Sequence, residues 1–258
     1  MKLSKKQLEL KDGIRKEWVL SNGIGGFAST TVVGANTRRY HGLLIAPILP
    51  PARRHLIISK LDESIKIGNE NFNLYTNLCT NYVSEGYKYL EKFEKEYIPI
   101  YTYKVGDVTI VKKVTMVYGR NTVVVVYNVK TAEEDATLTL APIINYRDFH
   151  HMTTTTDIEV KQKITGTKSR IEMPGNAYNP LYIYLSEGNY IEHKNDIFEG
   201  FTAKYSLHKL VYFETFEDEL SAIACEKYLK KCFRKTKEKL ISKKNPQWND
   251  LSDDFKLI

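Results

Sequence analysis

Long hydrophobic runs are missing from this 258-residue chain, and cysteine and proline are scarce. Residues 1–13 alternate charged and apolar side chains and lack the apolar region of a signal peptide. No stretch reaches the roughly 20 apolar residues that a transmembrane helix needs. Cys79, Cys225 and Cys232 are an odd number, which is typical of a reduced chain without a disulfide framework. We therefore expect a cytoplasmic protein with no membrane partner.

An excess of positive charge is also missing from most of the chain, although the net charge is +7. Segment 226–244 holds nine basic and two acidic residues, so the remainder is neutral overall. A nucleic-acid-binding protein would spread Lys and Arg over a face that follows the phosphates. We therefore interpret the basic segment as a solvated helix face and expect no nucleic-acid partner.

Strand patterns dominate the rest of the sequence, in which 12% of residues are aromatic. Segment 108–119 alternates apolar and polar residues, and the β-branched segment 121–130 predicts a strand buried on both sides, joined to it as a hairpin. Segment 136–145 predicts a third strand, and further hairpins are indicated by Gly68–Asn69 and Gly188–Asn189. The frequent turns predict a mainly β fold, a large antiparallel β-sandwich.

A change to helical spacing comes late in the chain. From Asp218 to Ile241 we expect one amphipathic helix of about six turns, because apolar residues recur at spacings of four or eight. The apolar positions are Leu220, Ala224, Tyr228, Cys232 and Leu240. Ser252 then begins a helix-capping pattern close to the last residue, which indicates either a fragment or a chain that depends on a partner.

A glycine-rich stretch at 22–28, "NGIGGFA", matches the G-x-G-x-x-A pattern of dinucleotide-binding proteins. The following residues are β-branched and offer no helix N-terminus for a pyrophosphate. The first candidate for the ribose-binding acid, Asp62, lies too far along the chain. We therefore assign the glycines to tight turns and expect no cofactor.

Catalytic and metal-binding patterns are weak. Arg147, Asp148, His150 and His151 gather at a strand end, but no second group of ligands has convincing spacing, so no metal site is expected. The chain has no G-x-S-x-G elbow, and its 31 acidic residues single out no pair for glycoside hydrolysis. A small hydrolase site around Asp148 and His150 stays open as a minor alternative.

Three stretches together resemble a known family. They are "EWVLSNGIGGFASTTVVGANTRRYHGLLIAP", "PPARRHLIISKLDE" and "LAPIINYRDFH", which lie in this order within residues 17–151. The run is similar to the opening of the archaeal and bacterial type glycogen debranching enzymes, which are amylo-α-1,6-glucosidases. The resemblance is dense up to residue 151 and weak over 153–218.

The resemblance implies an N-terminal antiparallel β-sandwich, a linker helix and a catalytic α/α barrel that hydrolyses α-1,6 branch linkages. No catalytic residue of the family falls within this sequence. We expect residues 1–217 to form the sandwich, and residues 218–258 to form the linker helix and the start of a barrel that is otherwise absent. The expected function is a non-catalytic domain that packs on the catalytic barrel and has α-glucan as a second partner. A free-standing α-glucan-binding module is the alternative.

The candidate site lies in two segments and is assigned to glycan contact or to a domain interface. On a strand, Arg38 and Tyr40 would share one face, and Arg39 and His41 the other. Arginine forks and tyrosine rings suit sugars as well as carboxylates of a neighbouring domain. Alternatively, Arg38 or Arg39 pairs with Asp62 or Asp148 while Tyr40 fills the core. The candidate residues are Asn36, Arg38, Arg39, Tyr40, His41, Arg147, Asp148 and His150.

Overall fold

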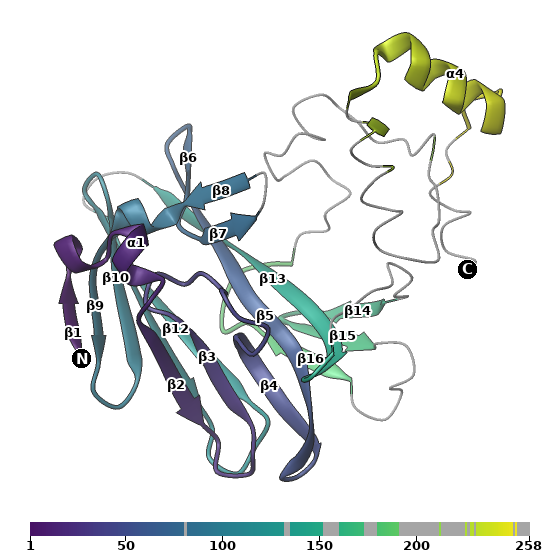
Figure 1. The fold of residues 1–258 in the computed structure, drawn as a ribbon. Coiled ribbons are helices and arrows are strands. Elements are labelled where there is room, and N and C mark those ends of the chain that lie inside the picture. Colours follow the sequence, from purple (N-terminus) through teal and green to yellow (C-terminus); the bar gives the residue numbers. More distant parts are fainter. Residues whose placement is uncertain are drawn as a thin grey trace. The chain divides into compact units, whose positions relative to one another are not determined.

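The chain divides into two compact units, Met1–Thr153 and Thr154–Ile258 (Figure 1). A computed structural model describes residues 1–79, 82–131, 135–151, 160–172, 180–190, 212, 225, 228–229, 231–249 and 251. The predicted boundary between residues 217 and 218 falls outside these residues and stays a prediction. Each unit is described by itself below.

Two antiparallel sheets form most of the first unit. One sheet has the order β1-β9-β10-β11-β12, and the other has the order β13-β5-β4-β3-β2, with β6 paired to β5. The strands of the first sheet are β1 (Lys2–Ser4), β9 (Leu90–Lys95), β10 (Pro99–Val105), β11 (Val108–Met116) and β12 (Val123–Lys130). Those of the second are β2 (Glu17–Ser21), β3 (Phe27–Thr31), β4 (Gly42–Leu49), β5 (Ala52–Ile67), β6 (Glu70–Asn73) and β13 (Ala136–Asp148).

Short elements complete the first unit. A small antiparallel pair joins β7 (Thr76–Cys79) to β8 (Tyr82–Glu85). The helical pieces are the 3₁₀ turns η1 (Lys5–Gln7) and η2 (Gly86–Tyr89) and the four-residue helix α1 (Leu10–Gly13). At the start of η2, a side chain on Gly86 would overlap the backbone of Leu74, so glycine is required for this close approach.

A buried core joins the two large sheets. The inward-facing rings of Tyr101 and Phe93 meet edge to face at 4.9 Å, and both side chains are buried. The buried Trp18 indole donates a hydrogen bond from the second sheet to the Tyr101 hydroxyl. Burial raises the pKa of that hydroxyl, which therefore stays protonated. The expected mainly β fold of antiparallel sheets is confirmed.

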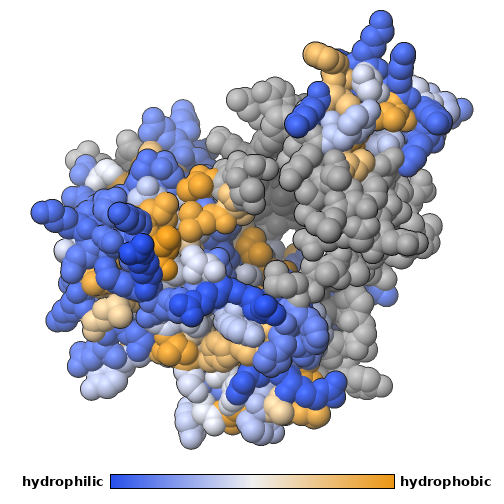
Figure 2. All heavy atoms as spheres, in the orientation of Figure 1, coloured by the Kyte–Doolittle hydropathy of each residue, from blue (hydrophilic) through white to orange (hydrophobic). Residues whose placement is uncertain are grey.

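The local strand and hairpin predictions are confirmed where the pattern is strong. Strand β11 pairs with β12, and β5 turns into β6 with Ile67 opposite Glu70. The prediction that segment 121–130 is buried on both sides is wrong, because Val124 and Val126 are exposed. The reason is that only one face of this sheet packs on the core, so alternate side chains of β12 point away from it. Figure 2 shows that apolar residues of the first unit reach the surface in patches bordered by hydrophilic ones.

The second unit contains a three-stranded antiparallel sheet with the order β14-β15-β16. Its strands are β14 (Lys161–Thr165), β15 (Lys168–Glu172) and β16 (Leu181–Tyr184). The bend at residues 186–188 follows β16, and the second arm predicted after Gly188–Asn189 lies largely outside the described residues. The sheet is therefore described with three strands only.

Helix α4 (Arg234–Lys244) lies near the C-terminus of the described residues. The prediction of one continuous helix over 218–241 is wrong, because Cys232 and Phe233 are not helical and Phe233 has an extended backbone. The apolar stripe is interrupted at position 236, where the residue is the polar Thr236. The sequence pattern therefore supports a single continuous helix less well. Much of segment 218–231, and the capping pattern at Ser252, lie outside the described residues. Among the helices that the structure describes, none is both long and apolar enough to span a bilayer.

Candidate functional site

A tight turn, instead of a strand, holds four of the predicted site residues. The backbone N–H of His41 donates to the carbonyl of Arg38 at 3.0 Å, and β4 begins only at Gly42. The predicted alternation of faces along residues 38–41 is therefore wrong. Instead, Arg38 and His41 meet Glu17, whereas Arg39 and Tyr40 meet the turn that follows β13.

The first of these groups is centred on Glu17. Arg38 Nε lies 2.7 Å from Glu17 Oε1, and His41 Nε2 lies 3.4 Å from the same oxygen. His41 Nδ1 accepts a hydrogen bond from the Thr37 backbone N–H at 3.0 Å, and its side chain is almost fully buried. Burial lowers the pKa of His41, and Arg38 lowers it further, against the opposing effect of Glu17. This histidine has a structural position and does not face solvent.

The second group is organised by Arg147. Its guanidinium donates to the Arg39 carbonyl, to the His151 carbonyl at 2.7 Å and to the Phe149 carbonyl at 3.3 Å. Arg39 Nη1 in turn donates to the His150 carbonyl at 2.7 Å. The two arginines thus connect two turns that are more than 100 residues apart in sequence.

The carboxylate of Asp148 closes the turn after β13. Its Oδ1 accepts from the His150 backbone N–H at 2.8 Å and lies 3.0 Å from His151 Nδ1. The hydrogen bond from His150, and then that from His151, lower the pKa of Asp148. Its position is that of a turn-stabilising acid, and neither Arg38 nor Arg39 pairs with it as the alternative interpretation expected.

Aromatic rings cover this double turn. The rings of Tyr40 and Phe149 lie 4.4 Å apart, and Phe149 meets Phe27 edge to face at 5.6 Å. The Arg39 guanidinium lies 5.6 Å from the centre of the Tyr40 ring. Tyr40 is 40% exposed, so the alternative that it fills the core is wrong. We call the group of Arg39, Tyr40, Arg147, Phe149 and His150 the arginine–aromatic turn.

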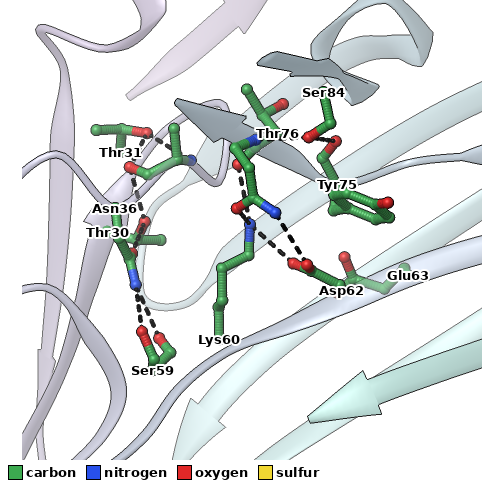
Figure 3. A network of polar contacts seen from close by, with 12 residues as sticks. Thr30, Thr31, Asn36, Ser59, Lys60, Asp62, Glu63, Tyr75, Thr76 and Ser84 are labelled. Atoms are coloured by element: carbon green, nitrogen blue, oxygen red, sulfur yellow. Dashed lines mark hydrogen bonds and ion pairs between the residues drawn. The ribbon is translucent and has the colours of Figure 1, made fainter. Parts of the chain in front are cut away.

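Asn36 lies apart from this group, inside the first unit. Its Oδ1 accepts from Thr30 Oγ1 at 2.7 Å, and its Nδ2 donates to the Ser59 carbonyl at 3.0 Å (Figure 3). A cavity of about 30 Å³ lies beside Asn36 and Ser59. This volume holds one or two water molecules and is too small for a sugar ring. Asn36 is therefore a structural residue at this place.

A group of buried charged residues lies near Asn36. The sequence analysis did not identify these residues as a candidate site. Lys60 Nζ is 2.9 Å from Asp62 Oδ1 and donates to the Thr76 carbonyl at 2.9 Å (Figure 3). Burial lowers the pKa of Lys60, against the opposing effect of Asp62. In a second cluster, Glu63 accepts from Lys112 and, at 2.8 Å, from the Tyr127 hydroxyl. The sequence feature that could have indicated these residues is the presence of charged side chains within the apolar strand segment 56–67.

The glycine-rich stretch forms the turn between β2 and β3, so no helix follows it. Asn22, a residue that sequence reasoning missed, is fully buried in this turn. Its Oδ1 accepts from the backbone N–H groups of Ile24 and Gly26 at 3.1 and 2.8 Å. Its Nδ2 donates to the Arg120 carbonyl at 3.0 Å, which connects this hairpin to the β11–β12 hairpin. The glycines here serve a turn, as expected.

The arrangement places aromatic rings and guanidinium groups next to one another in the two turns. Within the described ranges, no three His, Cys, Asp or Glu side chains lie close enough together to hold a metal ion. The structure brings together Arg39, Tyr40, Arg147, Asp148 and His150, and it places Arg38 and His41 on Glu17 and Asn36 in the interior.

Comparison with known families supports the resemblance noted in the sequence. Residues 16–227 match the family model described as "Glycogen debranching enzyme N terminal". The match covers well over half of the chain and includes both turns of the candidate site. No curated protein and no solved structure matches the chain. The chain therefore belongs to the glycogen debranching enzyme N-terminal family.

Proposed function

We propose that the chain acts as a non-catalytic N-terminal domain of a debranching enzyme, and that its arginine–aromatic turn packs against a catalytic α/α-barrel domain. The proposal is supported by the family description, which names an N-terminal part of such an enzyme. The parent activity would be the hydrolysis of α-1,6 branch linkages in glycogen-type α-glucans.

The exposed but braced Tyr40 ring is the observation on which this proposal rests. Tyr40 lies against Phe149 at 4.4 Å and is backed by Arg39. Aromatic residues and arginine are enriched at protein interfaces, where rigid side chains lose little entropy on binding. An aromatic pair held in place before binding is therefore well suited to docking.

The use of the arginine donors favours a protein partner over a sugar at this turn. Arg147 directs its donors to the carbonyls of Arg39 and of the turn after β13, and Arg39 donates to the His150 carbonyl. Fewer N–H groups are left for sugar hydroxyls. Direct glucan contact by a free-standing module is the second candidate, and the exposed Tyr40 side chain supports it.

A binding experiment with a separately expressed catalytic barrel tests the proposal. The chain is titrated with the α/α-barrel domain of a debranching enzyme from the same organism by isothermal titration calorimetry. Tyr40→Ser is expected to weaken association at least about tenfold, as for other central interface aromatics. Tyr97→Ser, at an 82% exposed tyrosine away from the turn, is the matched control and should bind like the parent chain.

Two outcomes would contradict docking. One is a parent chain that does not associate with the barrel. The other is a Tyr40→Ser variant that associates as tightly as the parent while its binding to glycogen is lost, which would favour the free-standing module.

A further inference from the structure

One face of the β14–β16 sheet carries cations from two strands and tyrosines from the third. Lys163 of β14 lies opposite Arg170 of β15, which lies opposite Tyr182 of β16. In the next row, Lys168 lies opposite Tyr184. Opposed residues, and alternate residues along a strand, point to the same side of a sheet, so these five side chains share one face. We call them the lysine–tyrosine face.

The lysine–tyrosine face is the outer face of its sheet. On the opposite face, Ser169 and Ile171 are buried. By contrast, Lys163 and Lys168 are exposed, and the two tyrosines of β16 are 42% and 66% exposed. The cations and the rings are therefore open to a ligand.

The charge of this face is positive. Lys161 and Glu172 form a further row on the same side, so the described residues of the face include four cations and one carboxylate. Arg170 donates to Glu172, but both side chains are partly exposed. Exposed ion pairs are weak, so an incoming anion can compete for the guanidinium. The excess of cations favours a negatively charged ligand.

The two tyrosine rings form a pair beside a cation. The ring centres of Tyr182 and Tyr184 lie 6.3 Å apart with an angle of 30° between the planes. Lys168 Nζ lies 4.5 Å from the centre of the Tyr182 ring and 5.4 Å from that of Tyr184. A cation next to both rings favours one arrangement of them. The pair is thus ordered before a ligand binds, which lowers the entropic cost of binding.

The combination of rings and cations distinguishes between classes of anionic ligand. An acidic protein segment would use the cations, but its carboxylates offer no flat surface to the tyrosine rings. Single-stranded nucleic acid has both groups, because its phosphates bind Lys and Arg and every base has a face that stacks on aromatic side chains. A duplex keeps its bases paired and stacked on one another, so the rings would stay unused. An unpaired strand therefore fits this face best.

We propose that the lysine–tyrosine face binds single-stranded nucleic acid, with bases stacked on the two tyrosines and phosphates held by the neighbouring cations. The proposal revises the expectation of no nucleic-acid partner, which follows from the charge excess in segment 226–244. Strand pairing gathers cations from β14 and β15 on one face, and the distribution of charge along the sequence does not indicate this. The proposal does not depend on docking through the arginine–aromatic turn.

Fluorescence anisotropy of the whole chain with a labelled oligothymidine of about 16 nucleotides tests the proposal. The plot of log affinity against log salt concentration should have a slope of about −2, because three cations each contact one phosphate of a single strand. Affinity should thus fall roughly twentyfold between about 50 and 200 mM salt. At the higher salt concentration, the same sequence in a duplex should bind more weakly than the single strand.

Two double variants separate the contribution of the rings from that of the charges. Tyr182→Ala/Tyr184→Ala should weaken binding at least about tenfold at each salt concentration and keep the slope, because the phosphate contacts remain. Lys163→Gln/Lys168→Gln should reduce the slope to about −0.7, because one phosphate contact remains. A role of these residues in folding alone would not produce this difference between the two slopes.

Matched controls change the same residue types elsewhere. Tyr97→Ala/Tyr118→Ala removes two exposed tyrosines of the first unit, and Lys235→Gln/Lys239→Gln removes two exposed charges of α4. Both should keep the parent slope and affinity, and circular dichroism checks that every variant keeps the parent β signal. Tyr40→Ser should also bind the oligonucleotide like the parent, so failure of docking and failure of nucleic-acid binding are distinguishable.

Four outcomes would overturn the proposal. The first is no binding at the lower salt concentration, and the second is a Tyr182/Tyr184 variant that binds as tightly as the parent. The third is an α4 variant that loses as much affinity as the Lys163/Lys168 variant, because binding would then follow net charge and not this face. The fourth is full displacement of the oligonucleotide by poly-L-glutamate of equal charge, which would indicate a site for acidic protein segments.

Discussion

Arg147 and Arg39 are joined through the main chain, because the Arg147 guanidinium donates to the carbonyl of Arg39. The same guanidinium binds the His151 carbonyl at 2.7 Å. A turn before β4 and a turn after β13 are therefore connected by one side chain. Since Tyr40 lies in the first turn and Phe149 in the second, this connection also sets how the two rings meet.

Arg147→Lys is expected to lower the free energy of unfolding by about 1–2 kcal/mol. Lysine keeps the charge but cannot reach several carbonyls with a planar fork. Urea denaturation followed by circular dichroism measures the change. Arg15→Lys, at an exposed arginine, is the matched control and should leave the midpoint where it is. Equal midpoints for the parent and both variants would contradict the role assigned to Arg147.

The single variant Lys60→Met should lower the free energy of unfolding more than the double variant Lys60→Met/Asp62→Asn. Removing the lysine leaves a carboxylate among buried groups, at a cost of about 3 kcal/mol. Neutralising both members of the pair removes the uncompensated charge, so Lys60→Met/Asp62→Asn should regain at least about 1 kcal/mol. Denaturant titration of the four members of the cycle gives the coupling energy.

A surface pair of similar geometry is the control for this cycle. Lys92 Nζ lies 2.8 Å from Glu94 Oε2, but both side chains are much more exposed. Lys92→Met should therefore change stability little. If Lys92→Met were as harmful as Lys60→Met, burial would not be the cause of the effect.

Stability should decrease as the pH falls below the ordinary pKa of histidine, because of His41. Burial lowers the pKa of His41 below its ordinary value of 6.5, so the unfolded chain takes up a proton in this range before the folded chain does. Proton uptake by the unfolded state favours unfolding. The stabilising contribution is thus complete above about pH 6.5 and is lost as the pH falls toward the lowered folded pKa.

Thermal unfolding of the parent chain and of His41→Gln between about pH 5 and 7.5 measures this effect. The parent should melt at a lower temperature at the acidic end, and the dependence should be weaker in the variant. An identical pH dependence for the two chains would show that His41 does not cause it.

Local patterns allowed much of the fold to be predicted from sequence. The alternation in β11, the turn at Gly68–Asn69 and the glycine turn before β3 depend on neighbouring residues, so the sequence alone indicates them. The one-sided exposure of Val126 could not be predicted, because it depends on which face of the sheet packs on the core.

The site was harder to predict, because its contacts join distant segments. The residues of both turns were identified, but the contact of Arg147 with Arg39 spans 108 positions. Because residues 38–41 form a turn, Arg38 groups with His41, and not with Tyr40 as strand alternation predicts. Lys60 forms its interactions across elements, with Thr76 among its partners, and no local spacing indicates such pairing.

Hydrogen exchange measured by mass spectrometry tests the docking proposal most directly. The chain is exchanged alone and with a saturating amount of the catalytic barrel, and peptides covering residues 38–41 and 147–151 are compared. The proposal predicts slower exchange in both peptides when the barrel is present. Unchanged exchange in these two peptides, with protection confined to other parts of the chain, would contradict it.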